Sequence, residues 1–302
     1  MTEEKPIKTL DTLVKDIYEA LEKGNVKIDT AKLAEVLDRR LNQEISERPR
    51  LRMSNLGAPC ERQLWYKINI PDKAEPLKGN VLLKFIVGDV LEELVLSIAE
   101  ACGHRVEHRQ RDVEVNGVQG HIDGIVDGVL VDVKSASSFS FDKFRRGLSD
   151  STDSFGYLSQ LGLYGHSTRE QVDQGARGTA AFIAVDKQHG HIHVDKHKLE
   201  ERDWESITEA KKEMVASSEP PPRAFHPVAE GKSGNLKLDV NCSYCPFKYE
   251  CYKGLRAFLY SKGPVYLTHV EREPDVPEIT PDKEMHKMSK GPTFGKVRFS
   301  KK

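Results

Sequence analysis

Asp123, Asp132 and Lys134 are the residues whose types and spacing could do chemistry. They belong to the segment 118–137, in which short β-branched runs flank Asp127–Gly128, a pattern that predicts two antiparallel strands joined by a tight turn. Such a hairpin would bring Asp123 and Asp132 close together. Paired carboxylates repel each other unless a divalent cation lies between them, and oxygen ligands favour hard ions. The pair therefore predicts a magnesium or manganese site.

Lys134 follows Asp132 by two residues, so both side chains would leave the strand on the same face. The lysine ammonium could orient an attacking water or stabilise charge that builds on a scissile phosphate. An Asp-x-Lys pattern also occurs on solvated strand faces, and Asp-Gly pairs form turns in many proteins. The hairpin alone leaves both interpretations open, so other parts of the chain must decide between them.

The elements that would position these residues can be followed along the chain. Residues 1–50 show apolar stripes at helical spacing, and we expect a helical appendage that lies on the core or contacts a partner. A long amphipathic helix is predicted over 81–102. It carries Glu92, which we expect in the metal site, with its neighbour Glu93 as the alternative ligand. Strand-like alternation over 106–115 then leads into the hairpin.

Another helix is predicted over 155–164, after the hairpin. Gln160 and Tyr164 lie four residues apart on it, so they share one face and can both point into a cleft. Basic and aromatic residues mix over 135–146, which suits either phosphates and unstacked bases or a polar surface loop. The remaining patterns predict a buried strand over 178–186, a strand pairing with it over 191–194, a charged helix over 198–217 and a strand over 263–267.

Composition excludes several classes of protein. With 302 residues, the chain can hold one large domain or a core domain with a smaller appendage. Its net charge is −1 with 31% charged residues, so any contact with nucleic acid must be a local patch. No stretch approaches the ~20 apolar residues of a membrane span, and the first residues lack the apolar core of a signal peptide. We therefore expect an intracellular protein without a membrane partner.

Three of the five cysteines, Cys242, Cys245 and Cys251, lie within one short segment. In a reducing compartment their C-x2-C-x5-C spacing indicates a metal site rather than disulfides. Three thiolates need a fourth ligand, for which Cys60 is available, whereas Cys102 at a helix end is typical of a small buried residue. Four thiolates suit either zinc or an iron–sulfur cluster, and the spacing does not separate the two.

Taken together, these motifs resemble the RecB-like branch of the PD-(D/E)XK nuclease superfamily. The resemblance is closest to its iron–sulfur members, such as the AddB nuclease domain and the CRISPR-associated RecB-like exonucleases. The family motifs fall on Gly88 and Glu92, on Gly120 and Asp123, on Asp132 and Lys134, and on Gln160 and Tyr164. The split cysteine motif falls on Cys60 upstream and on Cys242, Cys245 and Cys251 downstream. The match covers about residues 51–255. Many iron–sulfur relatives have histidine where this chain has Glu92, and glutamate there resembles the phage exonuclease type.

The resemblance implies a restriction-endonuclease-like α/β fold, with a central mixed sheet flanked by helices and an iron–sulfur subdomain. The expected domains are a helical appendage over 1–50, a nuclease domain over 51–262, and a strand with a basic tail over 263–302. The implied metal ligands are Glu92, Asp123, Asp132 and the carbonyl of Val133. Lys134 would position the nucleophile, while Gln160 and Tyr164 would steady either Lys134 or the DNA strand. The four cysteines would hold a [4Fe-4S] cluster, with zinc as the alternative.

The implied function is a Mg2+- or Mn2+-dependent DNA exonuclease of replication, recombination or repair. Two alternatives stay open: a structure-specific or nicking DNA endonuclease with the same site, and a non-catalytic DNA-binding recombination accessory factor. The expected partners are linear DNA, including single-stranded DNA, and a replication or recombination protein bound through residues 1–50 or through the basic tail over 281–302. The glutamate-type first motif favours a bacterial or phage origin, hence the cytoplasm of a bacterial or phage-infected cell.

Overall fold

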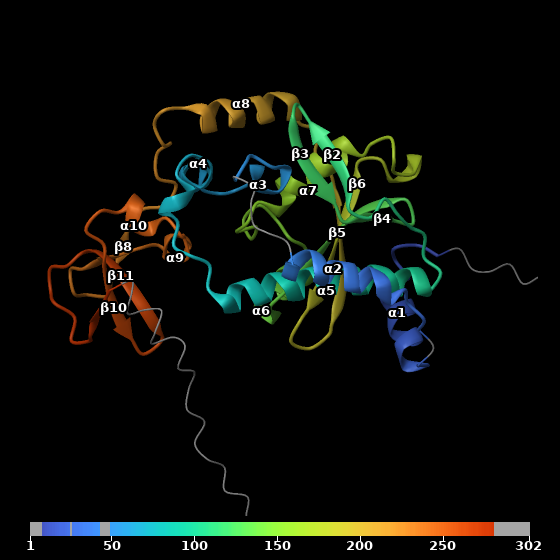
Figure 1. Cartoon of the computed structure of the whole chain (residues 1–302), viewed down its shortest axis with the longest axis horizontal. Helices are drawn as coiled ribbons and strands as arrows, with labels where there is room; N and C mark the ends of the chain where they lie inside the picture. The colour runs from blue at the N-terminus through green and yellow to red at the C-terminus, as the bar shows by residue number, and fades with distance from the viewer. Residues whose placement is uncertain (1–7, 25, 43–48, 281–302) are drawn as a thin grey trace, which may run out of the picture. The chain divides into compact units, whose positions relative to one another are not determined.

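The computed structural model of the protein describes residues 8–24, 26–42 and 49–280 (Figure 1). These residues form two compact units. The first comprises the chain up to Asn69 together with Leu77–Pro221, and the second comprises Ile70–Pro76 together with the chain from Pro222 onwards. The chain thus enters the second unit briefly between two helices of the first. The boundaries at residues 50 and 262 that the sequence indicates do not coincide with these divisions and stay a prediction.

The first unit is built around a five-stranded mixed sheet. Its strands lie in the order β1 (Val106–Glu107), β4 (Gly124–Val126), β5 (Val129–Ala136), β6 (Thr179–Asp186) and β7 (Ile192–Lys198). β5 and β6 run parallel, whereas every other neighbouring pair in this sheet is antiparallel. β6 is buried along nearly its whole length, which explains its almost continuous apolar sequence.

Helices cover both faces of this sheet. On one face, α1 (Leu13–Glu22) and α5 (Gly79–Ala101) pack against Val131, Val133 and Ile183. On the other, α3 (Met53–Leu56), α6 (Ser138–Arg145) and α7 (Tyr157–Ser167) pack with Leu130 and Phe182. The unit also contains α2 (Thr30–Asn42), α4 (Glu61–Asn69), the hairpin of β2 (Arg111–Val115) and β3 (Val118–Ile122), the 3-10 turn η2 (Gln174–Ala176) and α8 (Trp204–Ala216). The expected fold class, an α/β protein with a central mixed sheet flanked by helices, is confirmed.

Most elements lie where the sequence predicts them, with three corrections. The strand predicted over 106–115 is interrupted between β1 and β2, because His108 and Gln110 adopt positive φ, of 53° and 50°. The helix predicted from residue 155 begins at Tyr157, because Gly156 before it is left-handed, with φ of 78°. The helix predicted from residue 198 is wrong at its start, because β7 continues to Lys198 and α8 begins at Trp204. The Asp203 carboxylate accepts a hydrogen bond of 3.0 Å from the Ser206 N–H, and this cap sets the first turn of α8.

The second unit is a small antiparallel sheet with one 3-10 turn and two short α-helices. Its strand order is β12 (Glu278–Ile279), β10 (Arg256–Tyr260), β11 (Gly263–His269), β9 (Leu236–Lys237) and β8 (Val228–Ala229), and its helices are η1 (Pro71–Lys73), α9 (Val240–Ser243) and α10 (Lys248–Cys251). The predicted strand over 263–267 is confirmed as β11. The buried Lys248 ammonium pairs with Glu75, which ties the segment 70–76 to this unit. The predicted basic tail over 281–302 lies outside the described residues.

None of the helices in the described part of the chain combines the length and the apolar composition needed to cross a bilayer.

Candidate active site

Asp123 lies where the chain passes from one sheet to another. β3, before it, pairs with β2, whereas β4, after it, pairs with β5. The turn between β4 and β5 is tight because Asp127 and Gly128 both adopt positive φ, of 50° and 79°. The Asp123 Oδ2 accepts a hydrogen bond of 2.7 Å from the Val133 N–H. The hairpin therefore places Asp123 beside Asp132, as its pattern predicts.

Asp132 and Lys134 leave β5 on the same face and pair with each other. The Lys134 Nζ lies 2.6 Å from Oδ2 of Asp132, whose side chain is almost completely buried. The ammonium also lies 4.6 Å from the ring centre of Tyr157, a cation–π contact that no local sequence pattern predicts. Partial burial would lower the pKa of Lys134, but the negative charges of Asp132 and Asp123 raise it above its ordinary value. Lys134 is therefore a cation, suited to orient or stabilise negative charge.

Glu92 extends from α5 towards the same cluster. Gln110 donates a hydrogen bond to its Oε1. The loss of hydration around Glu92, followed by the charges of Asp132 and Asp89, raises the pKa of its carboxyl to about 7. Glu93, the alternative ligand, instead pairs with Arg109 at 2.6 Å and accepts a hydrogen bond from Ser97. Because the Glu93 carboxylate is already neutralised by Arg109, Glu92 is the better candidate for a metal ligand.

Gln160 and Tyr164 approach the cluster from α7. The Gln160 Nε2 donates to the Asp132 Oδ1 over 3.3 Å, and both α7 side chains are buried. Burial, and then the charge of Asp132, raises the pKa of Tyr164 to about 12, so its hydroxyl keeps its proton at neutral pH. The tyrosine ring fits because Gly120 lacks a side chain: a Cβ there would lie 2.8 Å from Tyr164 and from Met53. The close packing therefore explains why the Gly-x-x-Asp motif, here Gly120 to Asp123, has glycine at its first position.

A cavity of about 120 Å3 opens beside the acids. Glu92 and Asp123 line it together with Val36, Arg39 and Arg40 from α2. The remaining lining residues are Asp89, Glu93 and Gln110. Sequence reasoning missed the contributions of α2, Gln110 and Tyr157, because each depends on how elements distant in the chain pack together.

The buried carboxylates fit a divalent cation by their chemistry. The Asp132 Oδ2 is buried without a hydrogen-bond partner among the described residues, although the Lys134 ammonium lies beside it. Burial and the charges of Asp132 and Glu92 raise the pKa of Asp123 well above its ordinary value, which marks the strong mutual repulsion of the three acids. Oxygen donors of this kind match magnesium or manganese. In the described part of the chain, however, no three His, Cys, Asp or Glu side chains already form a metal-binding group. Glu92 is instead held by Gln110, and Asp123 by the Val133 N–H.

The cysteines fall in both units. Cys60 directly precedes α4 in the first unit, while Cys242, Cys245 and Cys251 lie in and between α9 and α10 of the second. All four are partly buried. Cys242 and Cys251 pack against the apolar core of the second unit.

Residues 9–252 match the sequence profile of the PD-(D/E)XK nuclease superfamily. The chain belongs to this superfamily. The matched region includes every residue that the sequence singled out for the site and for the cysteine set. Nucleases of the superfamily act on nucleic acids and use divalent metals such as Mg2+ or Mn2+.

Comparisons with individual proteins add little to this assignment. No curated protein matches this member of the superfamily. One solved structure, described as the crystal structure of SSO0001, is similar over 72% of this chain and 93% of its own. The sequence identity is 15% and the TM-score is 0.39.

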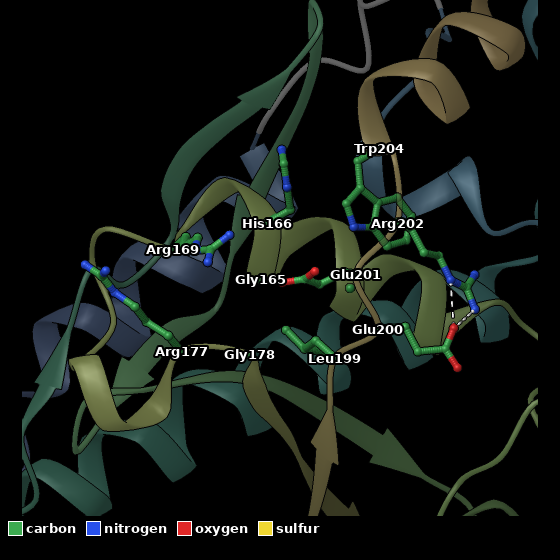
Figure 2. A pocket seen from close by; sticks show the side chains of 11 residues that line it. Gly165, His166, Arg169, Arg177, Gly178, Leu199, Glu200, Glu201, Arg202 and Trp204 are labelled. Atoms are coloured by element: carbon green, nitrogen blue, oxygen red, sulfur yellow. Dashed lines mark hydrogen bonds and ion pairs between the residues drawn. The ribbon is translucent and has the colours of Figure 1, made fainter.

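A larger cavity of about 370 Å3 lies elsewhere in this nuclease and contains none of the predicted site residues. Figure 2 shows its charged lining, in which Arg202 bonds to Glu200. Trp204 and Leu199 approach α7 so closely that a Cβ on Gly162 or Gly165 would collide with them. The cavity therefore lies where α7 packs against the chain around α8, apart from the acids.

Proposed function

We propose that this nuclease is a metal-dependent DNA exonuclease whose active site is the acid cluster with Lys134. The observation that carries the proposal is that Asp123 bonds to the backbone beside Asp132, that Lys134 pairs with Asp132, and that the charges of Asp132 and Lys134 both act on Glu92. The membership of the superfamily supports hydrolysis of nucleic acid there. The motif resemblance to RecB-like exonucleases supports DNA as the substrate and attack from an end.

In the proposed mechanism, Glu92, Asp123, Asp132 and the Val133 carbonyl would hold one or two Mg2+ or Mn2+ ions. When bound, such an ion would activate a water and stabilise charge on the scissile phosphate. The side chains around the acids would orient the reacting groups and limit their contact with water.

Lys134 supplies a fixed positive charge against which a nucleophile or a phosphate oxygen can be oriented. Gln160 holds the Asp132 carboxylate through its hydrogen bond, so that the carboxylate presents one direction. The Tyr157 ring lies against the Lys134 ammonium and reduces its contact with water. Lower hydration strengthens each of these electrostatic interactions.

Digestion of labelled DNA tests this proposal. The wild type should degrade linear DNA with Mg2+ or Mn2+, should leave closed circular DNA intact, and should be inactive in EDTA. Asp132→Asn should lose at least about a hundredfold in rate, because it removes a charge that both the cation and Lys134 need. Asp112→Asn, a change of the same kind on an exposed β2 residue, is the matched control and should retain full activity. Cleavage of closed circles would favour an endonuclease, and equal activity of Asp132→Asn would refute the site.

We further propose that Cys60, Cys242, Cys245 and Cys251 hold a [4Fe-4S] cluster. This rests on the spacing of the three later cysteines within one segment and on the resemblance for Cys60. Thiolate chemistry suits the cluster, and no step of the hydrolysis depends on it.

A further inference from the structure

The cavity beside the acids is strongly unbalanced in charge. Among its lining residues, Asp89, Glu92, Glu93 and Asp123 are acids, while the described cations that line it come from α2 alone, as Arg39 and Arg40. A phosphodiester backbone approaching this cavity meets repulsion from the acids. A strand can therefore stay near the cluster only if cations at the rim compensate for that repulsion.

The other cations of the neighbourhood are already engaged. The Lys134 ammonium forms an ion pair with Asp132 at 2.6 Å. The Arg109 guanidinium forms ion pairs with Glu93 at 2.6 Å and with Glu100 at 2.8 Å. Both cations are largely buried, so neither can turn outward without leaving an acid uncompensated. Among the side chains that line this cavity, only those of α2 can therefore compensate an incoming phosphate, in addition to any metal ion that the acids hold.

Arg39 and Arg40 are free to act in this way. Arg39 is exposed and forms no ion pair with any residue that the structure describes. Arg40 pairs with Asp89, but its side chain is 48% exposed, and an ion pair so placed contributes little and exchanges readily. Guanidinium groups bind phosphate oxygens through two parallel hydrogen bonds, which an ammonium cannot do.

The position of α2 over the site is fixed by packing. The helix lies along α5, as Figure 1 shows, with Val36 buried against it. Lys32, one helical turn before Val36, pairs with Glu100 on α5 at 3.2 Å. Residues 39 and 40 follow Val36 by one turn, and the cavity opens beneath them.

We propose that Arg39 and Arg40 form a phosphate-binding site that holds the nucleic-acid strand beside the acid cluster. The proposal rests on the proposed function, because it places the substrate of that site. α2 is then part of the substrate-binding surface, and Arg40 exchanges Asp89 for a phosphate when a strand binds.

Strand binding in EDTA tests this site without any cleavage. The measurement is the fluorescence anisotropy of a labelled single-stranded oligonucleotide, titrated with the full chain at several salt concentrations. Arg39→Ala with Arg40→Ala should weaken binding at least about tenfold, because two charge-assisted contacts are lost. The slope of log K against log salt should shrink by about 1.4, the value for two phosphates on a single strand.

Two controls separate strand binding from a structural role of the helix. Lys15→Ala removes an exposed charge from α1, which does not line the cavity, and should change neither affinity nor slope. Asp89→Asn removes the partner of Arg40 and should leave binding equal or tighter. If Asp89→Asn weakened binding as much as the double variant does, the Arg40–Asp89 ion pair would serve only to dock α2, and the inference would be wrong.

The remaining outcomes are also decisive. Equal affinity and slope in the double variant and the wild type would overturn the phosphate site. Tighter binding in the double variant would show α2 to be an occluding helix instead, which also overturns it. The proposed function fails separately, if the wild type binds the oligonucleotide but does not cleave it with Mn2+.

Discussion

Glu92 is the residue whose surroundings most clearly predict a pH dependence. Its carboxyl has a pKa of about 7 in the folded chain, against an ordinary value of 4.5, because burial and neighbouring acids disfavour its charge. Between these two values the folded chain keeps a proton that the unfolded chain releases. The stability of the metal-free protein should therefore fall as pH rises from about 4.5 to 7, and this contribution should level off above 7.

Thermal unfolding in EDTA across this range measures that effect. Glu92→Gln should flatten the fall in melting temperature between pH 5 and 7, because glutamine carries no proton to release. Adding Mn2+ at pH 8 should raise the melting temperature of the wild type more than that of the variant. An identical pH profile for both proteins would show that Glu92 is an ordinary solvated acid.

The residues of the site differ in how far the sequence could predict them. Asp123, Asp132 and Lys134 could be predicted because a hairpin is a local structure, in which turn residues and alternation fix which side chains meet. Gln160 and Tyr164 could be predicted from helical spacing. Tyr157, Gln110 and the arginines of α2 reach the site only through tertiary packing, for which no local pattern exists.

At the scale of elements, the close approach of β3 to α3 and α7 is the feature that positions Tyr164. Gly120→Ala would place a Cβ 2.8 Å from both Met53 and Tyr164. Overpacking of this kind costs about 1–3 kcal/mol in unfolding free energy, and here it should also displace the tyrosine from the site. We expect a lower denaturation midpoint in urea and a loss of nuclease rate at temperatures where the variant is still folded.

Gly175→Ala is the matched control for this substitution. A Cβ at Gly175 meets no atom within 4 Å, so stability and rate should both stay unchanged. If Gly120→Ala behaves like the control, the glycine of the Gly-x-x-Asp motif has no packing role.

Elements also show where sequence patterns are insufficient. The run over 195–198 is polar and charged and gave no strand signal, yet β7 continues to Lys198 because its backbone pairs with Thr179 on β6. Pairing with a buried neighbour overrides weak local propensity. The buried strand β6 shows the opposite case, because its almost continuously apolar sequence predicts it without such pairing.

At the scale of the whole molecule, the cysteines are divided between the two units, and the cluster proposal predicts an observable cofactor. The purified protein should be brown, with an absorption band near about 400 nm and bound iron. Cys251→Ser should lose this band and lower the melting temperature, because a cluster ligand is removed. Cys102→Ser, at the end of α5, should keep both. A colourless protein with stoichiometric zinc would refute the iron–sulfur assignment while leaving the nuclease site intact.

The most direct test of the central claim concerns Lys134, because its charge links the acids to the phosphate. The measurement is the single-turnover rate of linear DNA degradation with Mn2+, compared between Lys134→Ala and Lys198→Ala, a matched change on the adjoining part of the sheet. Lys134→Ala should lower the rate at least about a hundredfold with the fold retained, as judged by circular dichroism, while Lys198→Ala should match the wild type. Equal rates in the two variants would contradict the assignment of this cluster as the active site.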